Sequence, residues 1–326
     1  MFTKMHTFAS YLLLAAAPCM AADQNAVLWQ APRPMTVADW TWGPGGEARA
    51  PQAPFQFIGE DFRGTNPKIK VRDAKGQHWT VKFGGEDHSE VFAARLLFAL
   101  GYQAQPSYFV RSGVVAGVHG LKRAKPFLGK HGEFAYARFK LRDSKKITRV
   151  EGKDWAWTNN PFTGTHELNG LKIVMMLASN WDAKDSRDGK GSNTAIYAES
   201  SPQGERLYYA FDDWGATFGK WGGFFSRNKW DADGYRTQTR AFVRSDDGES
   251  VRWGYRGKHA KDITTGVGIE DVRWLLPYLT SMSDEDLRAG LRASGASAAE
   301  TETYTTSIRN RIEQLRRLCG SPRASR

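Results

Sequence analysis

The pattern of apolar and polar residues changes from strand-like to helix-like within the first third of the chain. Three short apolar stretches predict strands: residues 55–58, 68–71 and 79–83. A turn at residues 73–76 predicts that the last two strands form a hairpin. From Ser89 the apolar residues recur at helical spacing, and Gly101 ends this run. Further strands are expected at 108–110 and 114–118, so the pattern predicts a sheet accompanied by one helix.

The second half of the chain is predicted to be mainly helical. Residues 166–179 are apolar on nearly every side, which predicts a buried helix. Ser283 is followed directly by acidic residues, the combination preferred at a helix N-terminus, and predicts a helix at 284–292. A last helix presents one apolar stripe: Tyr304, Ile308, Ile312, Leu315 and Leu318. The elements therefore predict an α+β protein whose later part is mostly helix.

The first 54 residues differ from the rest of the chain. A basic start, an apolar run at residues 11–17 and small residues up to Ala21 are typical of a secretory signal peptide. This run is too short to span a bilayer, so no transmembrane helix is expected in the mature chain. We expect cleavage near Ala21 and an exported protein, periplasmic or secreted. Acylation at Cys19 is the alternative, which Pro18 disfavours. Residues 22–54, rich in proline and glycine, predict an irregular lead-in.

Charge narrows the choice of partners. The 326 residues carry a formal net charge of +11, and loss of residues 1–21 would remove Lys4 and no acid, leaving +10. Such an excess favours contact with phosphates, anionic lipid or acidic polymers. Only Cys319 would remain after cleavage, so neither an intramolecular disulfide nor a thiolate metal site is expected. Nucleic acid is not expected as a partner, because the chain has no groove-reading motif.

Two segments of the first half carry residues suited to phosphate groups. Gly64, Thr65 and Lys68 belong to a Gly-Thr-Asn-Pro-Lys turn, where backbone N–H groups can approach phosphate oxygens. Lys82 lies inside an otherwise apolar strand, and Glu90 begins the following helix. The alternatives are an ordinary turn and a solvent-exposed lysine on an edge strand.

Two segments of the second half offer acidic and amide side chains. The first runs from Asn180 through Asp182 and Lys184, and a polar insert connects it to Asn193. The second, Phe-Asp-Asp-Trp-Gly at 211–215, follows an apolar strand and contains Asp213. Carboxylates of this kind hold a divalent metal or orient an attacking hydroxyl in phosphoryl transfer.

Each of these acids has a neighbour that competes for its role. Asp185 is an alternative to Asp182, and Asp212 is an alternative to Asp213 if the register differs by one residue.

Taken together, the four segments resemble the atypical kinase-like superfamily that includes phosphatidylinositol 3/4-kinases and HipA-type kinases. The turn at 64–68 is similar to the HipA-type phosphate loop, and the turn at 211–215 resembles the Asp-Phe-Gly metal-binding turn. The resemblance spans residues 57–318 and implies a two-lobed kinase-like fold. An antiparallel sheet with one helix would form the N-lobe, and the C-lobe would be mainly helical.

The resemblance also implies boundaries and a subgroup. A signal peptide (1–21), a lead-in (22–54), an N-lobe (55–120) and a C-lobe (121–326) are expected. The combination of Asn-Pro-Phe at 160–162, Asn-Trp-Asp at 180–182 and Gly-Ala-Thr-Phe-Gly at 215–219 is similar to an exported bacterial subgroup.

Site roles follow from the same resemblance. Lys82 would hold nucleotide phosphates and Glu90 would hold Lys82. Asp182 would orient or deprotonate the acceptor hydroxyl, and Lys184 would occupy a position that related kinases give to a histidine or basic group. ATP and magnesium are the implied cofactors, with Asn193 and Asp213 as metal ligands. This chain departs from the family because Arg187 stands where the shorter pattern has asparagine, so residues 186–192 must bulge outward.

Two functions are consistent with these residues. The first is an ATP-dependent phosphotransferase, or a nucleotidyl transferase that uses the same pocket, acting on an unspecified acceptor. The second is a catalytically inactive pseudokinase that binds an envelope polymer, a lipid or a protein. Export favours the second, because extracytoplasmic space is generally poor in ATP. A nucleotide and a phosphate-bearing or anionic envelope component are the expected partners.

Overall fold

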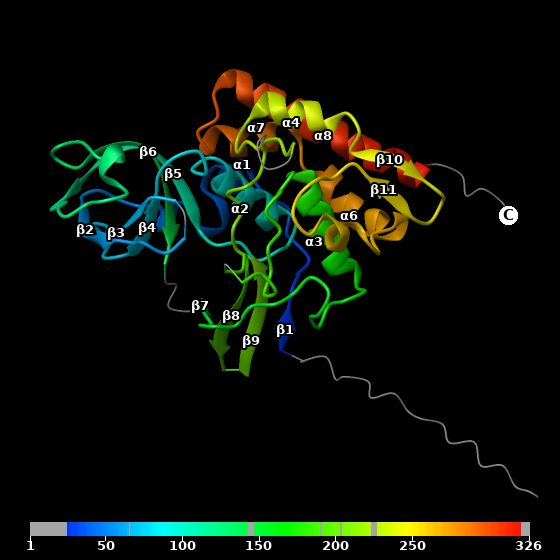
Figure 1. The fold of residues 1–326 in the computed structure, drawn as a ribbon, viewed down its shortest axis with the longest axis horizontal. Helices are drawn as coiled ribbons and strands as arrows, with labels where there is room; N and C mark the ends of the chain where they lie inside the picture. Colours follow the sequence, from blue (N-terminus) through cyan, green and yellow to red (C-terminus); the bar gives the residue numbers. More distant parts are fainter. Residues whose placement is uncertain are drawn as a thin grey trace, which may run out of the picture.

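A five-stranded barrel forms one end of the molecule (Figure 1). The computed structural model describes residues 25–320 apart from 65, 143–146, 190, 203 and 223–226. The expected signal peptide, with Cys19 and Ala21, lies outside the described residues, as does Thr65. The barrel strands are β2 (Phe55–Glu60), β3 (Lys68–Arg72), β4 (His78–Lys82), β5 (Ser107–Ala116) and β6 (Glu133–Leu141).

The predicted sheet is confirmed but is more closed than expected. Its strand order is β2-β3-β4-β6-β5, and a parallel contact between β2 and β5 completes the barrel. The two strands expected at 108–110 and 114–118 are one continuous strand, β5. The barrel extends past the expected lobe boundary at residue 120, to Leu141. Alternating apolar side chains fill its interior, including Ile69, Val71, Trp79, Val81 and Phe139.

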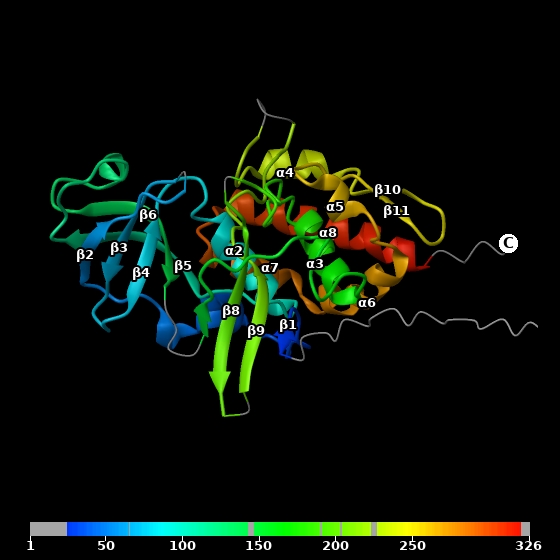
Figure 2. The ribbon, with the colours of Figure 1, turned by 60° about the horizontal axis from the view of Figure 1, so that its bottom comes forward.

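Helix α2 (Ser89–Ala99) begins and ends where the sequence predicts, but it packs into the other lobe. Ten of its eleven residues are buried, and Phe92, Leu96 and Leu97 belong to the hydrophobic core of the helical lobe. The ring of Phe92 lies 5.0 Å from that of Phe218. A helix buried on nearly all sides can contact two lobes at once, and α2 lies between them in both ribbon views (Figures 1 and 2).

The second lobe is mainly helical. Its helices are α3 (His166–Leu177), α4 (Ala232–Thr239), α5 (Ala260–Thr264), α6 (Ile269–Ser281), α7 (Asp284–Ala293) and α8 (Ala298–Gly320). Three predictions are confirmed here: the buried helix that begins at His166, the helix capped by Ser283, and the apolar stripe along the last helix. The barrel, α2 and the helical lobe together make the two-lobed α+β arrangement that the sequence predicts.

Two small sheets and three short 3-10 helices are also found among the described residues. The order in the larger sheet is β1-β9-β8-β7, comprising β1 (Ala26–Val27), β7 (Ile147–Arg149), β8 (Thr194–Ser201) and β9 (Gly204–Phe211). The smaller pairs β10 (Val243–Asp246) with β11 (Val251–Trp253). Single-turn 3-10 helices lie at η1 (Gly43–Gly45), which packs beside α2, and η2 (Glu47–Arg49). A third, η3 (Lys125–Phe127), lies between β5 and β6.

The expectation of an irregular lead-in is only partly met. Strand β1 pairs in parallel with β9, and helix α1 (Val37–Trp42) contacts α7. A capping box between Thr36 and Asp39 starts α1, and Trp40 is 1% exposed. The sequence analysis did not predict α1 in this segment, which is rich in proline and glycine. A short capped helix that is anchored by one tryptophan gives no periodic pattern of apolar residues.

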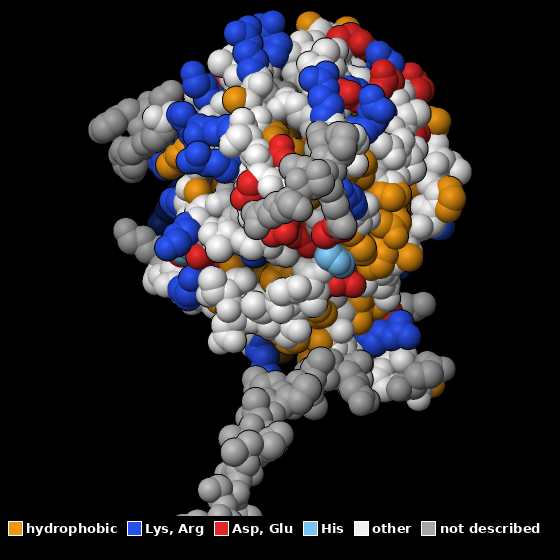
Figure 3. Space-filling model, turned by 90° about the vertical axis from the view of Figure 1, so that its right-hand side faces the viewer, with side chains coloured by type: hydrophobic (Ala, Val, Ile, Leu, Met, Phe, Trp, Pro, Cys, Tyr) orange, Lys and Arg blue, Asp and Glu red, His pale blue; other side chains and the backbone are white. Residues whose placement is uncertain are grey.

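The surface is mixed but strongly basic in places. Figure 3 shows lysine and arginine side chains along the upper edge of the helical lobe, the edge where α4 and α8 lie in Figure 1. The groove between these helices includes Arg236, Arg240, Arg244 and Arg317. Among the described residues, no helix combines the length and apolar character that a membrane span requires.

A buried arginine joins the lead-in to α2. Arg95 is 1% exposed, and its guanidinium donates to four backbone carbonyls: those of Trp40, Thr41, Val91 and Ser107, at 2.7–3.2 Å. Burial lowers the pKa of Arg95 to about 10. These hydrogen bonds hold α1, α2 and the start of β5 in a fixed position relative to one another.

Replacing Arg95 tests this junction. Arg95→Met should lower the free energy of unfolding by about 2–4 kcal/mol, because several buried carbonyls lose their donor. Chemical denaturation measures the loss. Arg72→Met, at an exposed position on β3, is the matched control and should change stability by less than about 0.5 kcal/mol. Equal midpoints for Arg95→Met and the wild type would contradict this account.

Candidate functional site

One cavity of about 1,090 Å³ lies between the barrel and the helical lobe. It is bounded by the loop before β3, the end of β4, the loop after α3 and the turn after β9. Seven of the predicted site residues line it: Gly64, Lys68, Lys82, Asp182, Lys184, Asn193 and Asp213. Glu90 lies just behind this lining and reaches the cavity through Lys82. The structure therefore brings together the predicted side chains that it describes.

Lys82 is the last residue of β4 and is only 7% exposed. Its Nζ lies 2.6 Å from Glu86 and also pairs with Glu90. Burial would lower the pKa of Lys82, but the carboxylates of Glu90, Asp213 and Glu86 outweigh it and raise this pKa above its ordinary value. The lysine is therefore held as a cation, and it is not the exposed edge-strand lysine of the alternative.

Glu86 is a site residue that the sequence analysis missed. Its carboxylate bonds Lys82 with one oxygen and Lys229 with the other. It also packs against Gly215, where an added Cβ would lie 2.4 Å from the Glu86 carboxyl carbon. The available signal was its spacing, because Glu86 stands four residues from both Lys82 and Glu90. Glycine at 215 therefore makes room for the acid, besides forming the turn.

Asp213 rather than Asp212 lines the cleft. Asp213 accepts the backbone N–H of Gly215 at 3.0 Å. Burial alone would raise the pKa of Asp213, but the Lys82 charge and this N–H hold it well below its usual range. Asp212 instead pairs with Lys140 of β6 at 2.5 Å. The register expected for the Asp-Trp-Gly turn is the one observed.

The loop after α3 presents Asp182 to the cleft. Asn180, fully buried, accepts the Asp182 N–H at 3.1 Å and donates to the Asp213 carbonyl at 3.3 Å. It thereby ties the two acidic loops together. The Asp182 carboxylate lies 2.9 Å from Lys258 and 3.6 Å from Lys184. The sequence analysis did not single out Lys258, because its contact depends on a bridge between segments far apart in sequence.

Asp185 has a different environment from Asp182. It is fully buried, accepts the Trp157 N–H at 2.9 Å and forms an ion pair with Arg187 at 2.6 Å. Arg187 also pairs with Asp262 at 2.6 Å. Both carboxylate oxygens of Asp185 are thus engaged away from the cavity, which makes Asp182 the better placed of the two acids.

Asn193 lies beside both acidic loops. Its side-chain amide donates to the Asp182 carbonyl at 2.7 Å, and its backbone carbonyl accepts the Asp212 N–H at 2.7 Å. Strand pairing causes this approach, since Thr194 is opposite Phe211 in the β8–β9 ladder. In the described part of the insert between Asp185 and Asn193, Asp188 pairs with His259 at 2.7 Å, whereas Gly191 and Ser192 line the cavity.

The other side of the cleft is cationic. Lys68 and Lys82 are direct cross-strand partners in the β3–β4 ladder, and both line the cavity. Within the part of the chain that the structure describes, no carboxylate lies within 4 Å of the Lys68 amine. Burial lowers the pKa of Lys68, with partial compensation from Asp61. Like charges opposite each other are unfavourable, so an anion here would stabilise the pair.

Gly64 closes the turn before β3 with a positive φ of 68°. The site for its Cβ would lie 3.5 Å from the Lys68 amine, so the turn and this lysine are neighbours. Arg123 donates to the carbonyls of Phe62 and Gly64, both at 3.0 Å, and braces the turn from outside. Glycine is the residue that adopts this backbone most readily.

The acids of the cleft suit a divalent cation. Carboxylate oxygens of Glu86, Glu90 and Asp213 all lie within 4.8 Å of one another. Such oxygen donors, together with the amide of Asn193, are the ligand type that magnesium and manganese prefer. A second group, Asp185, Asp188 and His259, has similar spacing, but the Arg187 guanidinium already neutralises it.

Asp87 is a buried acid behind the Lys82–Glu90 pair. It is 2% exposed, and its Oδ1 has no hydrogen-bond partner among the described residues. Burial raises the pKa of Asp87 to about 8, and Glu90 adds to the rise while Arg138 opposes it. Arg138 itself pairs with Glu90 at 2.9 Å. The acid therefore remains protonated over most of the neutral range.

Comparisons with known proteins identify no close relative. No family model matches the chain, and no curated protein matches it. A solved structure of the Golgi casein kinase is similar, with a TM-score of 0.41 at 10% identity, over 85% of this chain and 74% of that one. The same kinase with Mn/ADP bound gives a TM-score of 0.38 at 10% identity, over 84% and 75%. Assignment to the phosphatidylinositol 3/4-kinase or HipA-type branch stays a prediction.

The raised pKa of Asp87 predicts a pH-dependent effect of Asp87→Asn. An unfolded aspartate titrates near pH 4, so the folded wild type should lose stability as pH rises from about 4 to about 8. The asparagine variant cannot ionise. It should be more stable than the wild type at pH 8 and nearly equal to it at pH 5.

Urea denaturation at the two pH values measures the difference. Glu205→Gln, at an exposed position on β9, is the control and should show no such change between pH 5 and pH 8. A constant difference between Asp87→Asn and the wild type would show that the carboxyl does not titrate in this range.

Proposed function

We propose that the chain is an exported kinase-like phosphotransferase that uses ATP and a divalent metal. The observation that carries the proposal is that Lys82, Asp182 and Asp213 all line one cavity between the two lobes. Phosphoryl transfer depends on the positioning of the reactants and on the stabilisation of phosphate charge. This cleft contains the types of side chain that such a reaction uses, namely cations, carboxylates and an amide.

The barrel side supplies the phosphate contacts in this proposal. Lys82, kept charged by Glu86 and Glu90, would bind phosphate oxygens of the nucleotide. Lys68, which has no carboxylate partner among the described residues, would bind a further phosphate. Asp213 and Asn193 would hold the metal, which when bound neutralises phosphate charge and polarises the transferred group.

The helical side supplies the acceptor contacts. Asp182 would accept the proton of the acceptor hydroxyl. The hydroxyl oxygen would form a bond to the transferred phosphorus, while the bond from that phosphorus to the leaving diphosphate oxygen breaks. Lys184 and Lys258 flank this carboxylate. The guanidinium carbon of Arg227 lies 5.5 Å from the Trp181 ring centroid, and the amine of Lys229 lies 5.9 Å away. This concentration of cations supports an acceptor that is a phosphate-bearing or otherwise anionic envelope component.

One observation favours the second function, a pseudokinase that binds without transferring phosphate. The Asp182 carboxylate already pairs with two lysines, Lys184 and Lys258, so an acceptor hydroxyl would have to compete with them for its oxygens. The same cavity would then bind an anionic polymer, lipid headgroup or protein. Nucleotide binding and phosphate transfer have to be measured separately to distinguish the two.

Nucleotide protection is the first test. ATP with magnesium or manganese at about 100 times Kd should raise the free energy of unfolding by about 2–3 kcal/mol, seen as a higher Tm. Asp213→Ala should lose most of this gain, because the metal loses a ligand. Glu205→Ala is the matched surface control and should keep it. Absence of any Tm shift with millimolar nucleotide would contradict nucleotide binding.

Asp182→Asn separates the two functions in the same assay. It should retain the Tm gain, since Asp182 faces the acceptor, and should lower phosphate transfer to an anionic acceptor by about 10²–10⁴-fold. Protection in the wild type without any transfer to phosphorylated or carboxylated acceptors would favour the pseudokinase.

Export is tested with a reporter that is active only outside the cytoplasm. Fusion of residues 1–54 to such a reporter should give an active, processed product, and replacement of the apolar run at 11–17 by polar residues should abolish it. An unprocessed reporter that stays in the cytoplasm would contradict export. It would also remove the objection to catalysis that ATP is scarce outside the cytoplasm.

A further inference from the structure

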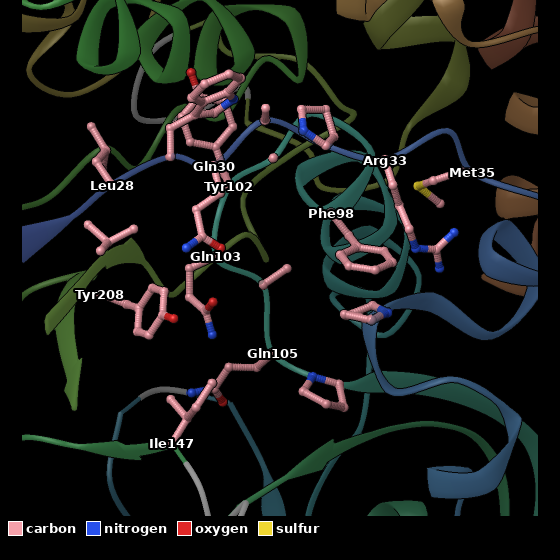
Figure 4. A pocket seen from close by; sticks show the side chains of 18 of the residues that line it. Leu28, Gln30, Arg33, Met35, Phe98, Tyr102, Gln103, Gln105, Ile147 and Tyr208 are labelled. Atoms are coloured by element: carbon pink, nitrogen blue, oxygen red, sulfur yellow. The ribbon is translucent and has the colours of Figure 1, made fainter. Parts of the chain in front are cut away.

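A second cavity lies apart from the cleft and shares no lining residue with it. Its volume is about 450 Å³, within the range of small-molecule sites. The walls come from the segment after β1, the end of α2 with its connection to β5, the end of β6, and single residues of β7 and β9. Figure 4 shows Tyr208 and Ile147 on one side of this cavity, and Phe98 and Arg33 on the other.

The walls of this pocket are fixed by hydrogen bonds between distant segments. The Trp29 indole donates to the Leu100 carbonyl at 2.7 Å, and the Gln30 N–H donates to Gly101 at 2.9 Å. On another wall, the Leu141 N–H donates to the Pro106 carbonyl at 3.1 Å. A ligand would therefore meet a largely preformed cavity and would not have to order its walls.

The lining has one sign of charge. Three arginines and three glutamines contribute to it: Arg33, Arg49, Arg142, Gln30, Gln103 and Gln105. No aspartate, glutamate or lysine is among the described residues that line it. Arg33 is neutralised by Asp39 at 2.6 Å, whereas no carboxylate within the described ranges lies within 4 Å of Arg49 or Arg142. These two guanidiniums offer positive charge at the rim, where a carboxylate can be bound in bidentate fashion.

Apolar side chains make up the remainder of the lining. Leu28, Met35, Phe98, Leu141 and Ile147 form its larger apolar contributors. The arginines and glutamines of the lining suit the anionic end of a ligand, and the apolar residues suit an apolar body. We propose that this pocket binds a small organic carboxylate with an aromatic ring or short aliphatic chain, at a site separate from the nucleotide cleft.

The position of the pocket gives such a ligand an effect on the cleft. The pocket is lined by Phe98 and Gly101 at the end of α2, the helix that carries Glu90, and by Leu141 of β6 and Ile147 of β7. A ligand there would restrain these elements. Its binding is therefore linked to nucleotide binding, a consequence that rests on the proposed function.

Calorimetric titration with 2-naphthoate and with octanoate tests the site. At least one of them should bind saturably with a stoichiometry of one, and its uncharged amide should bind at least 10-fold more weakly. The double variant Arg49→Gln with Arg142→Gln should weaken binding by about 10-fold or more. Ala104→Trp, which fills the pocket, should abolish it while a cooperative thermal transition shows that the variant is folded.

The matched control is Arg252→Gln, an exposed arginine of β11 outside the pocket, which should bind both probes like the wild type. The proposal is overturned if neither carboxylate binds at millimolar concentration. It is equally overturned if the amides bind as well as the acids, or if the pocket variants bind like the control.

A nucleotide titration in the presence of the bound carboxylate tests the coupling separately. Nucleotide affinity should change by about 5-fold or more. An unchanged affinity would overturn the coupling and leave the carboxylate site intact. A protein that binds the carboxylate but no nucleotide would count against the proposed function alone.

Discussion

The burial of the Lys82 ammonium is the constraint on which the cleft depends. A cation that is 7% exposed is costly unless carboxylates compensate for its lost hydration. Its compensation comes from outside the barrel that carries it, because Glu86 precedes α2, Glu90 lies in the first turn of α2, and Asp213 follows β9. The ion cluster therefore joins the barrel, α2 and the helical lobe at one point, and the same residues form the wall of the cavity.

Helix α2 transmits this constraint because it belongs to both lobes. Its first turn meets the barrel through Glu90, whereas Phe92 and its apolar neighbours lie in the core of the helical lobe. Arg95 fastens the middle of the helix to α1 and to β5. The Lys140–Asp212 ion pair provides a second link across the lobes, one residue before Asp213. The acids of the cleft are thus positioned by a helix that the core holds rigidly.

The interlobe cleft and the pocket at the end of α2 each contain more cationic than acidic residues, but their chemistry differs. The cleft mixes lysines and arginines with acids that can hold a metal, as phosphate chemistry requires. The pocket at the end of α2 is lined by arginines, glutamines and apolar side chains, and no acid is among the described residues of its lining. We propose that such a lining binds a carboxylate with an apolar body. The basic residues of the chain are therefore divided between two sites for which we propose different ligands.

The sequence by itself determined the features that depend on neighbouring residues: the strands, the helix ends at Ser283 and Gly101, and the order of the four chemical segments. Tertiary structure alone decided which acids face the cavity. Glu86 and Lys229 meet across 143 positions, and Lys258 reaches Asp182 from another segment. Asp185, the alternative to Asp182 in the sequence, is buried against Arg187. Periodicity and capping report local geometry, whereas these contacts arise only when packing brings distant segments together.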